Sequence, residues 1–215
     1  MTTLVVYPDT GSGNTTVDGY AEVTGANATW GDIRAAAGTA SGDTDSNVRC
    51  CWVAASTTSN QFARNRRSVF TFDTTTVPAG ATISAVTCSL YGTAKNNGLG
   101  NPALHVVNST PAANNDVANG DYGNVGTTDY GNVSYASYST TGYNDISLDT
   151  AAVTKAGITR LGARLSWDFS DTFGGTWSSG ATSNFYINWS DNGSSQPKLT
   201  VVYTVPVPRS FAVLV

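Results

Sequence analysis

The sequence predicts an all-β fold: a two-sheet β-sandwich with jelly-roll-like topology, one short helix and an extended C-terminal tail. The first observation is composition, because only 12% of the 215 residues are charged and Thr, Ser, Gly and Asn supply most of the polar surface. β-branched Thr suits a pleated strand, whereas Gly lowers the stability of a helix. The second is the single Glu and the three Lys, too few for long helices with charged pairs at i and i+4. The third is an alternation of apolar and polar residues in about ten short segments separated by turn-forming residues.

The first half of the chain contains five segments with this alternation. We expect strands at residues 4–7, 48–54, 68–73, 83–91 and 104–107. In the second of these, Cys50, Trp52 and Ala54 alternate and are expected on one face of the strand. A Pro-Ala-Gly turn at 78–80 would join the third and fourth segments as a hairpin.

The second half of the chain contains three more strands and a helical turn. The expected strands cover residues 159–169, 185–189 and 199–205. In the longest one, Leu165 and Trp167 would face the core, while Arg164 and Asp168 would point to the outer face. A short helix is expected at residues 150–156, with Asp149 as N-cap and Gly157 as the left-handed residue that ends it.

The same alternation predicts the core and the state of the cysteines. Expected core residues are Phe70, Phe72, Val86, Cys88, Leu90, Leu165, Trp167, Ile187 and Val201. Cys50, Cys51 and Cys88 are expected to be small buried residues, and we infer a chain made in a reducing compartment. A disulfide between Cys88 and one of the other two is the alternative. Cys50 and Cys51 are poor partners for each other, because neighbours in a strand point to opposite faces.

A short repeat occupies the polar segment between Thr110 and Thr141. Residues 121–125 have the same sequence as residues 129–133, at a period of eight. Paired turns in a long surface connection are the favoured interpretation. A binding loop lined by Tyr122 and Tyr130 is the alternative, because long loops in compact domains are often functional.

Charge and hydropathy exclude two classes of partner. The net charge of −4 and a pI of about 4.7 argue against nucleic-acid binding, which requires a basic stripe. The only local basic cluster is Arg64, Arg66 and Arg67. No apolar run has the length that spans a bilayer, and the first residues do not read as a secretory signal, so no membrane partner is expected.

The sequence contains little that suggests catalysis or a cofactor. His105 is the only histidine, and it alternates within an expected strand, so we expect a strand residue and no enzyme activity. Asp168 and Asp171 are close in sequence but are expected on a strand and in a turn, respectively. Residues 43–47 place oxygens as the start of a calcium loop does, but Val48 stands where an EF-hand needs Gly. We expect no cofactor, with a structural Ca²⁺ in another loop geometry as the alternative to a solvated turn.

Trp177 is the aromatic residue that the strand pattern does not place in the core. It stands in a polar loop with glycines at 174, 175 and 180. A lid folded over one end of the sandwich is the favoured interpretation, and contact with a glycan or a protein partner is the alternative.

Two longer stretches resemble a known family. Residues 67–73 and 77–91 resemble the hallmark strand, Pro-Gly turn and strand of DNRLRE-type domains, the β-sandwiches of carbohydrate-binding module family 96. Residues 196–203 are similar to the way those domains end. The longer arrangement is similar to uncharacterised phage proteins that are thought to be virion components, through residues 16–20, 30–34, 91–98 and 162–167. The resemblance implies a non-enzymatic β-sandwich that binds either a glycan or other virion proteins.

The C-terminal segment differs from the rest of the chain. We expect a single domain at residues 1–205 and a tail at residues 206–215, in which Val205-Pro-Val-Pro208 forces an extended path. The tail carries the apolar residues Phe211, Val213, Leu214 and Val215. It would dock either on a neighbouring chain, which the Pro-x-Pro spacer favours, or as an edge strand on its own sheet.

These features together predict a virion structural protein. It would decorate a capsid or belong to a tail or fibre, bind neighbouring subunits and form a homo-oligomer after synthesis in the host cytoplasm. The alternative is a carbohydrate-binding module that attaches to a polysaccharide or host-surface glycan, located outside the cell or on its surface.

Overall fold

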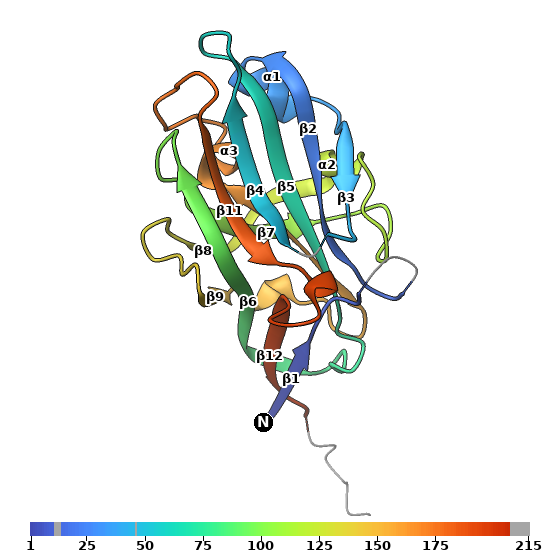
Figure 1. Cartoon of the computed structure of the whole chain (residues 1–215). Coiled ribbons are helices and arrows are strands. Elements are labelled where there is room, and N and C mark those ends of the chain that lie inside the picture. The colour runs from blue at the N-terminus through green and yellow to red at the C-terminus, as the bar shows by residue number, and fades with distance from the viewer. Residues whose placement is uncertain (11–13, 46, 207–215) are drawn as a thin grey trace, which may run out of the picture.

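The computed structural model describes residues 1–10, 14–45 and 47–206 (Figure 1). Its strands are β1 (Thr2–Val6), β2 (Asp18–Ala28), β3 (Ala40–Gly42), β4 (Asn47–Ala55), β5 (Phe62–Asp73), β6 (Thr82–Asn97), β7 (Leu104–Ser109), β8 (Val125–Val133), β9 (Gly142–Leu148), β10 (Ile158–Leu165), β11 (Thr182–Asn188) and β12 (Lys198–Thr204). Its helices are α1 (Trp30–Ala35), α2 (Asp121–Asn124) and α3 (Ser166–Phe169), with 3-10 turns η1 (Thr150–Ala152) and η2 (Ser190–Asn192). The prediction of an all-β fold is confirmed.

All the strands belong to one antiparallel sheet, which curls back on itself. Its order is β1-β12-β6-β11-β4-β5-β10-β7-β8, with β9 on β6 and β2 on β5. β5 pairs with β4 through its first half and with β10 through its second half, and the 16-residue β6 changes partners from β12 and β9 to β11. At the far side β8 lies beside β9, where the Asp149 N–H donates to the Tyr130 carbonyl at 2.9 Å. All the strands thus belong to one hydrogen-bonded sheet, and the division into two sheets that we expected is not confirmed.

The core lies inside this curled sheet and contains the residues that the alternation predicts. All nine predicted core residues are buried, and the most exposed of them is Trp167 at 7%. The ring of Phe70 stacks on that of Trp189 with centroids 5.5 Å apart. The period-two pattern thus placed the inward face of β5, β6, β11 and β12 correctly.

The expected strand at 159–169 is too long. β10 ends at Leu165, which pairs with Leu104 at the beginning of β7. The Ser166 N–H then donates to the Ala103 carbonyl at 2.8 Å, and residues 166–169 form α3. Because the chain turns helical here, Asp168 points into the protein and is 0% exposed, so its expected place on an outer strand face is wrong.

The helical turns also differ from the expectation. Asp149 does cap its turn, since its carboxylate accepts from the Ala151 N–H at 2.8 Å, but η1 ends at Ala152. The left-handed residue is Ala156, with φ of 52°, and not Gly157. The helix α1 was not expected at all, although Thr29 caps it by accepting from the Asp32 N–H.

A β-bulge in β4 explains the position of the cysteines. Phe185 pairs with Cys51 and Tyr186 pairs with Arg49, so Cys50 is the extra residue. The bulge shifts the alternation, and Trp52 points outward, not with Cys50 as expected. Both Cys50 and Cys51 are fully buried, with their Sγ atoms 3.9 Å apart. Together with the buried Cys88 they are free thiols, as the favoured interpretation predicted.

Candidate functional site

Trp177 is held against one end of the sheet. It lies in the connection between α3 and β11, is partly buried and packs against the core. Its indole Nε1–H donates to the Gln61 carbonyl at 2.8 Å, on the loop before β5. These contacts fix the ring as a cover over this end, and the rest of its surface remains open to a ligand or partner.

The two copies of the repeat adopt different structures, so the expectation of paired turns is wrong. The first copy forms α2, and Tyr122 within it is 0% exposed. Its hydroxyl donates to the Ile33 carbonyl and accepts from Asn65 Nδ2, both at 2.8 Å. The second copy is the end of β8, where Tyr130 is partly buried. Tyr122 and Tyr130 therefore do not form a common binding surface, and Tyr122 belongs to the interior.

Tyr122 borders a buried ionic cluster centred on Asp168. The guanidinium of Arg67 makes two bonds to the carboxylate, at 2.7 and 2.8 Å. Arg34 Nε lies 3.0 Å from the carboxylate and Arg164 Nε 3.1 Å from it. Burial alone would raise the pKa of Asp168, but Arg67 and the other two guanidinium groups lower it below its ordinary value. Burial lowers the pKa of Arg164 to about 10.

The cluster joins parts of the chain that are far apart in sequence. Arg34 comes from α1, Arg67 from β5, Arg164 from β10 and Asp168 from α3, and Arg34 also pairs with Asp171. Since two buried cations and one partly buried cation share one buried anion, we interpret the cluster as a structural centre that fixes α1 and α3 against the sheet. The burial of Asp168 could not be predicted from the sequence pattern, because it depends on where β10 ends.

The outer surface of β2, β5, β4 and β11 carries a second concentration of charge and rings. We call it the arginine–aromatic face, and it consists of Tyr20, Glu22, Arg49, Trp52, Arg64, Arg66 and Tyr186. The pairing of neighbouring strands places these residues together. Arg66 of β5 lies opposite Glu22 of β2 and opposite Trp52 of β4. Arg49 of β4 lies opposite Tyr186 of β11. Residues directly opposite each other in a sheet point to the same face.

The guanidinium groups of this face lie against its rings. The Cζ atoms of Arg49 and Arg64 are 4.0 and 3.9 Å from the centre of Trp52, and that of Arg66 is 3.4 Å from Tyr20. These distances are within the range of cation–π attraction. Glu22, the single Glu of the chain, accepts from Arg66 Nε at 2.7 Å and from Arg64 Nη1 at 3.2 Å.

The arginine–aromatic face has surplus positive charge and unused hydrogen-bonding atoms. Three guanidinium groups face the carboxylate of Glu22, with Asp45 beside Tyr20 as a further acidic group, in a chain whose net charge is −4. Within the described residues, buried polar atoms without a hydrogen-bond partner include Trp52 Nε1, Arg49 Nε and Asn184 Oδ1, and Asn184 lies opposite Trp52 in the register. Such a surface can offer charge-assisted hydrogen bonds. The alternation of Arg64 and Arg66 was visible in the sequence, but the outward turn of Trp52 was hidden by the bulge.

His105 is a hydrogen-bonded strand histidine, as expected. Its Nδ1 lies 3.0 Å from a carboxylate oxygen of Asp129 on the neighbouring β8. Its ring stacks on Phe169 with centroids 4.7 Å apart. Both contacts hold the ring at the end of β10 where α3 begins.

The acidic segment near Asp43 does not converge on one point. Asp43 lies near Asp116, whereas Asp45 lies beside Tyr20. Burial, together with the negative charge of Asp116, raises the pKa of Asp43. In the part of the chain that the structure describes, no three His, Cys, Asp or Glu side chains gather as a metal site requires. A structural Ca²⁺ stays an untested prediction.

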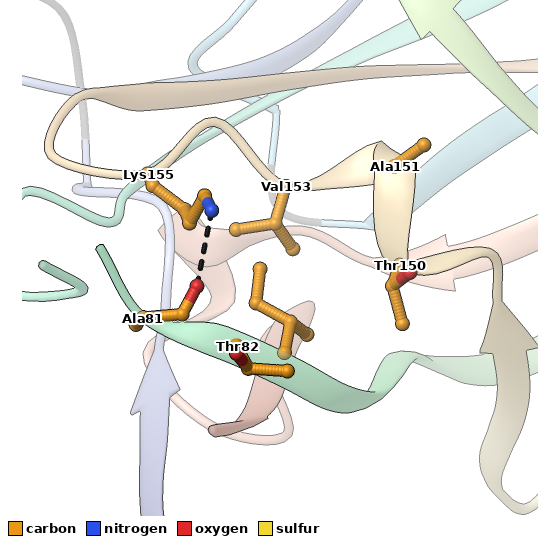
Figure 2. Close-up of a pocket in the computed structure, with 7 residues that line it drawn as sticks. Ala81, Thr82, Thr150, Ala151, Val153 and Lys155 are labelled. Carbon is orange, nitrogen blue, oxygen red and sulfur yellow. Dashed lines mark hydrogen bonds between the residues drawn. The ribbon is translucent and has the colours of Figure 1, made fainter. Parts of the chain in front are cut away.

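A shallow depression of about 400 Å³ lies between the beginning of β6 and the turn η1 (Figure 2). Among the residues that line it, Lys155 is the only charged one, and its ammonium group donates to the Ala81 carbonyl at 3.0 Å. The other lining residues are Thr82, Ile83, Thr150, Ala151 and Val153. This lining does not point to a particular reaction.

The strand β1 forms an open edge of the sheet. Among the described residues, β12 is the only strand that pairs with it. The exposed large hydrophobic side chains of the described residues are Met1 (89%), Val5 (44%), Tyr7 (46%) and Val205 (51%). Figure 1 shows β1 and β12 side by side at the same end of the molecule. We call this surface the β1 edge.

The predicted assembly residues Phe211, Val213, Leu214 and Val215 lie outside the described residues. No helix in the described part of the chain is long and apolar enough to span a membrane. Comparison of the chain with protein-family models gives no match, and a search of curated proteins finds no relative. The resemblance to carbohydrate-binding module family 96 therefore stays a prediction.

Proposed function

We propose that the protein is a non-enzymatic structural component of a virion, attached to a capsid or tail, that works by binding neighbouring subunits. The observation that carries the proposal is the β1 edge, because three of the four exposed large hydrophobic side chains of the described residues lie within residues 1–7, and the fourth, Val205, directly follows β12, the partner of β1. An exposed apolar patch on a soluble protein typically marks a contact with a partner.

The chemistry of the β1 edge favours association. Edge strands usually avoid pairing by carrying charged side chains, prolines or bulges. No side chain in residues 1–7 is charged, none of these residues is proline, and the pairing of β1 with β12 contains no bulge. The unpaired N–H and C=O groups of β1 can therefore accept another strand, while Val5 and Tyr7 add apolar area to the contact.

The proposal is tested by the association of the purified full-length chain, measured by light scattering over a range of concentrations. We expect oligomers that dissociate on dilution. Val5→Lys should weaken association at least tenfold, because it places a charge on the contact. Thr127→Lys, on the exposed surface of β8, is the matched control and should leave association unchanged. A chain that remains monomeric at millimolar concentration would contradict the proposal.

A second candidate function is the binding of an acidic glycan by the arginine–aromatic face. It is favoured by the guanidinium groups of Arg49 and Arg64, which the ring of Trp52 holds on this face, because guanidinium groups bind carboxylates. Retention on a polysaccharide array tests it. Trp52→Ala should abolish retention and Trp177→Ala should preserve it, with circular dichroism confirming that both variants are folded. If Trp177→Ala alone abolishes retention, the loop surface binds the glycan, and no retention of the unmodified chain removes the candidate.

A further inference from the structure

The chain leaves the sheet immediately beside the β1 edge. In the register of β1 and β12, Thr2 is opposite Tyr203, and β12 ends one residue later at Thr204. Val205 is exposed, and the described part of the chain ends at Pro206. In the sequence, the segment at residues 209–215 follows soon after this point.

We propose that the segment Arg209–Val215 of one copy pairs as an additional strand with the open edge of β1 in a second copy. This inference rests on the proposed function and specifies which surfaces meet. Strand addition to a sheet edge uses main-chain hydrogen bonds for affinity and alternate side chains for specificity. Seven residues are enough to run along the five residues of β1. Phe211, Val213 and Val215 alternate, so they would lie on one face beside the exposed Val5.

The sequence between β12 and this segment favours a second copy over the chain's own edge. To reach its own β1 edge, the chain would have to reverse direction around the end of β1 within Val205–Pro208. The ring of each proline fixes its φ, and each X-Pro bond restricts the preceding Val to extended conformations. These restrictions oppose a tight reversal and favour a spacer that projects from the sheet.

Size favours this exchange over simple pairing of two β1 strands. Specific interfaces bury about 1,200 Å² or more of surface in total. Two β1 strands that pair with each other contribute only five residues each, which is few for an interface of that area. Reciprocal exchange between two copies makes two such contacts. It also gives the apolar residues at positions 211–215 of each chain a contact in the partner copy.

Disulfide cross-linking tests the proposal in the full-length chain. Thr3 is exposed on β1, so Thr3→Cys is combined in turn with Phe211→Cys, Val213→Cys or Val215→Cys. Because Cys50, Cys51 and Cys88 are 0% exposed, they will not compete under mild oxidation. We expect at least one pair to give a cross-linked dimer on a non-reducing gel. Thr127→Cys combined with the same tail positions is the control and should give none.

Truncation after Val205 separates failure of this inference from failure of the proposed function. The truncated chain should keep its melting temperature within a few degrees, because β12 ends at Thr204, yet associate at least tenfold more weakly. Suppose that the truncated chain associates as well as the full chain, whereas Val5→Lys associates more weakly. This result would overturn the inference and leave the proposed function standing. Cross-linking within single chains, detected at monomer mass, also overturns the inference. If the full chain is monomeric throughout, both are overturned.

Discussion

Replacing Asp168 with Asn would remove the carboxylate that two buried guanidinium groups and one partly buried guanidinium group share. The side chains of Arg67 and Arg164 are 3% and 6% exposed, and that of Arg34 is 13% exposed, so water cannot replace the lost charge. Breaking a buried ion pair by removing one partner typically costs about 3–5 kcal/mol. In a protein of this size, about 2–4 °C of melting temperature is lost per kcal/mol, so we expect a decrease of about 6–20 °C.

Urea denaturation at pH 7, followed by circular dichroism and tryptophan fluorescence, measures the free energy of unfolding directly. Asp171→Asn is the matched control, because the Asp171 side chain also pairs with Arg34 but is 70% exposed. It should cost less than about 1 kcal/mol. A loss below about 1 kcal/mol for Asp168→Asn would refute the structural role that we assign to the cluster.

The stability lost in Asp168→Asn should also depend on pH, in a direction that the pKa of Asp168 determines. The folded-state pKa of Asp168 lies below its ordinary value of 3.8. A carboxylate with a lowered pKa stabilises the fold fully above the unfolded-state pKa, and this contribution is lost as the pH falls through the folded-state pKa. The difference in stability between the unmodified chain and Asp168→Asn should therefore be constant near neutral pH and shrink below about pH 4.

Two further predictions concern burial. Burial raises the pKa of Asp18 to about 7, although the hydrogen bonds from Ser190 lower it. The unmodified chain should therefore lose stability as the pH rises from about 4 to 7, because over this range the unfolded chain releases the Asp18 proton more readily than the folded chain. Asp18→Asn should remove this slope in urea denaturation at several pH values, and an equal slope in both proteins would show that the reasoning is wrong. Leu165→Ala should cost about 2–5 kcal/mol, because Leu165 is 0% exposed on β10 between β5 and β7. A cost below about 1 kcal/mol, measured in the same way, would contradict its central position.

The core could be predicted from sequence because the strand period depends only on neighbouring residues. Val86, Cys88 and Leu90 alternate without interruption, and they lie on the inward face of β6 as predicted. The end of β10 could not be predicted in this way. Trp167 and Phe169 continue the alternation beyond Leu165, but the strand stops there because β7 begins at Leu104 and offers no further partner.

The candidate sites were less predictable, because they depend on register and on contacts between distant segments. Trp52 was assigned to the wrong face since one extra residue, Cys50, shifts the alternation of β4. The repeat also shows that local sequence does not determine these structures, because identical sequences form a helical turn around Tyr122 and a strand around Tyr130. Tyr122 is drawn inward by hydrogen bonds to Ile33 and Asn65, which no local pattern contains.

The position of β6 in the sheet constrains the order of events during synthesis. Its pairing partners β9, β11 and β12 all follow it in the chain, and the last of them begins at Lys198. β1 must likewise wait for β12, almost 200 residues later. Closing such long loops slows folding and leaves strands unpaired for longer. A nascent chain that has not yet reached β12 therefore lacks a partner for its first strand and for one side of β6, and such unpaired strands are prone to aggregate until synthesis is complete.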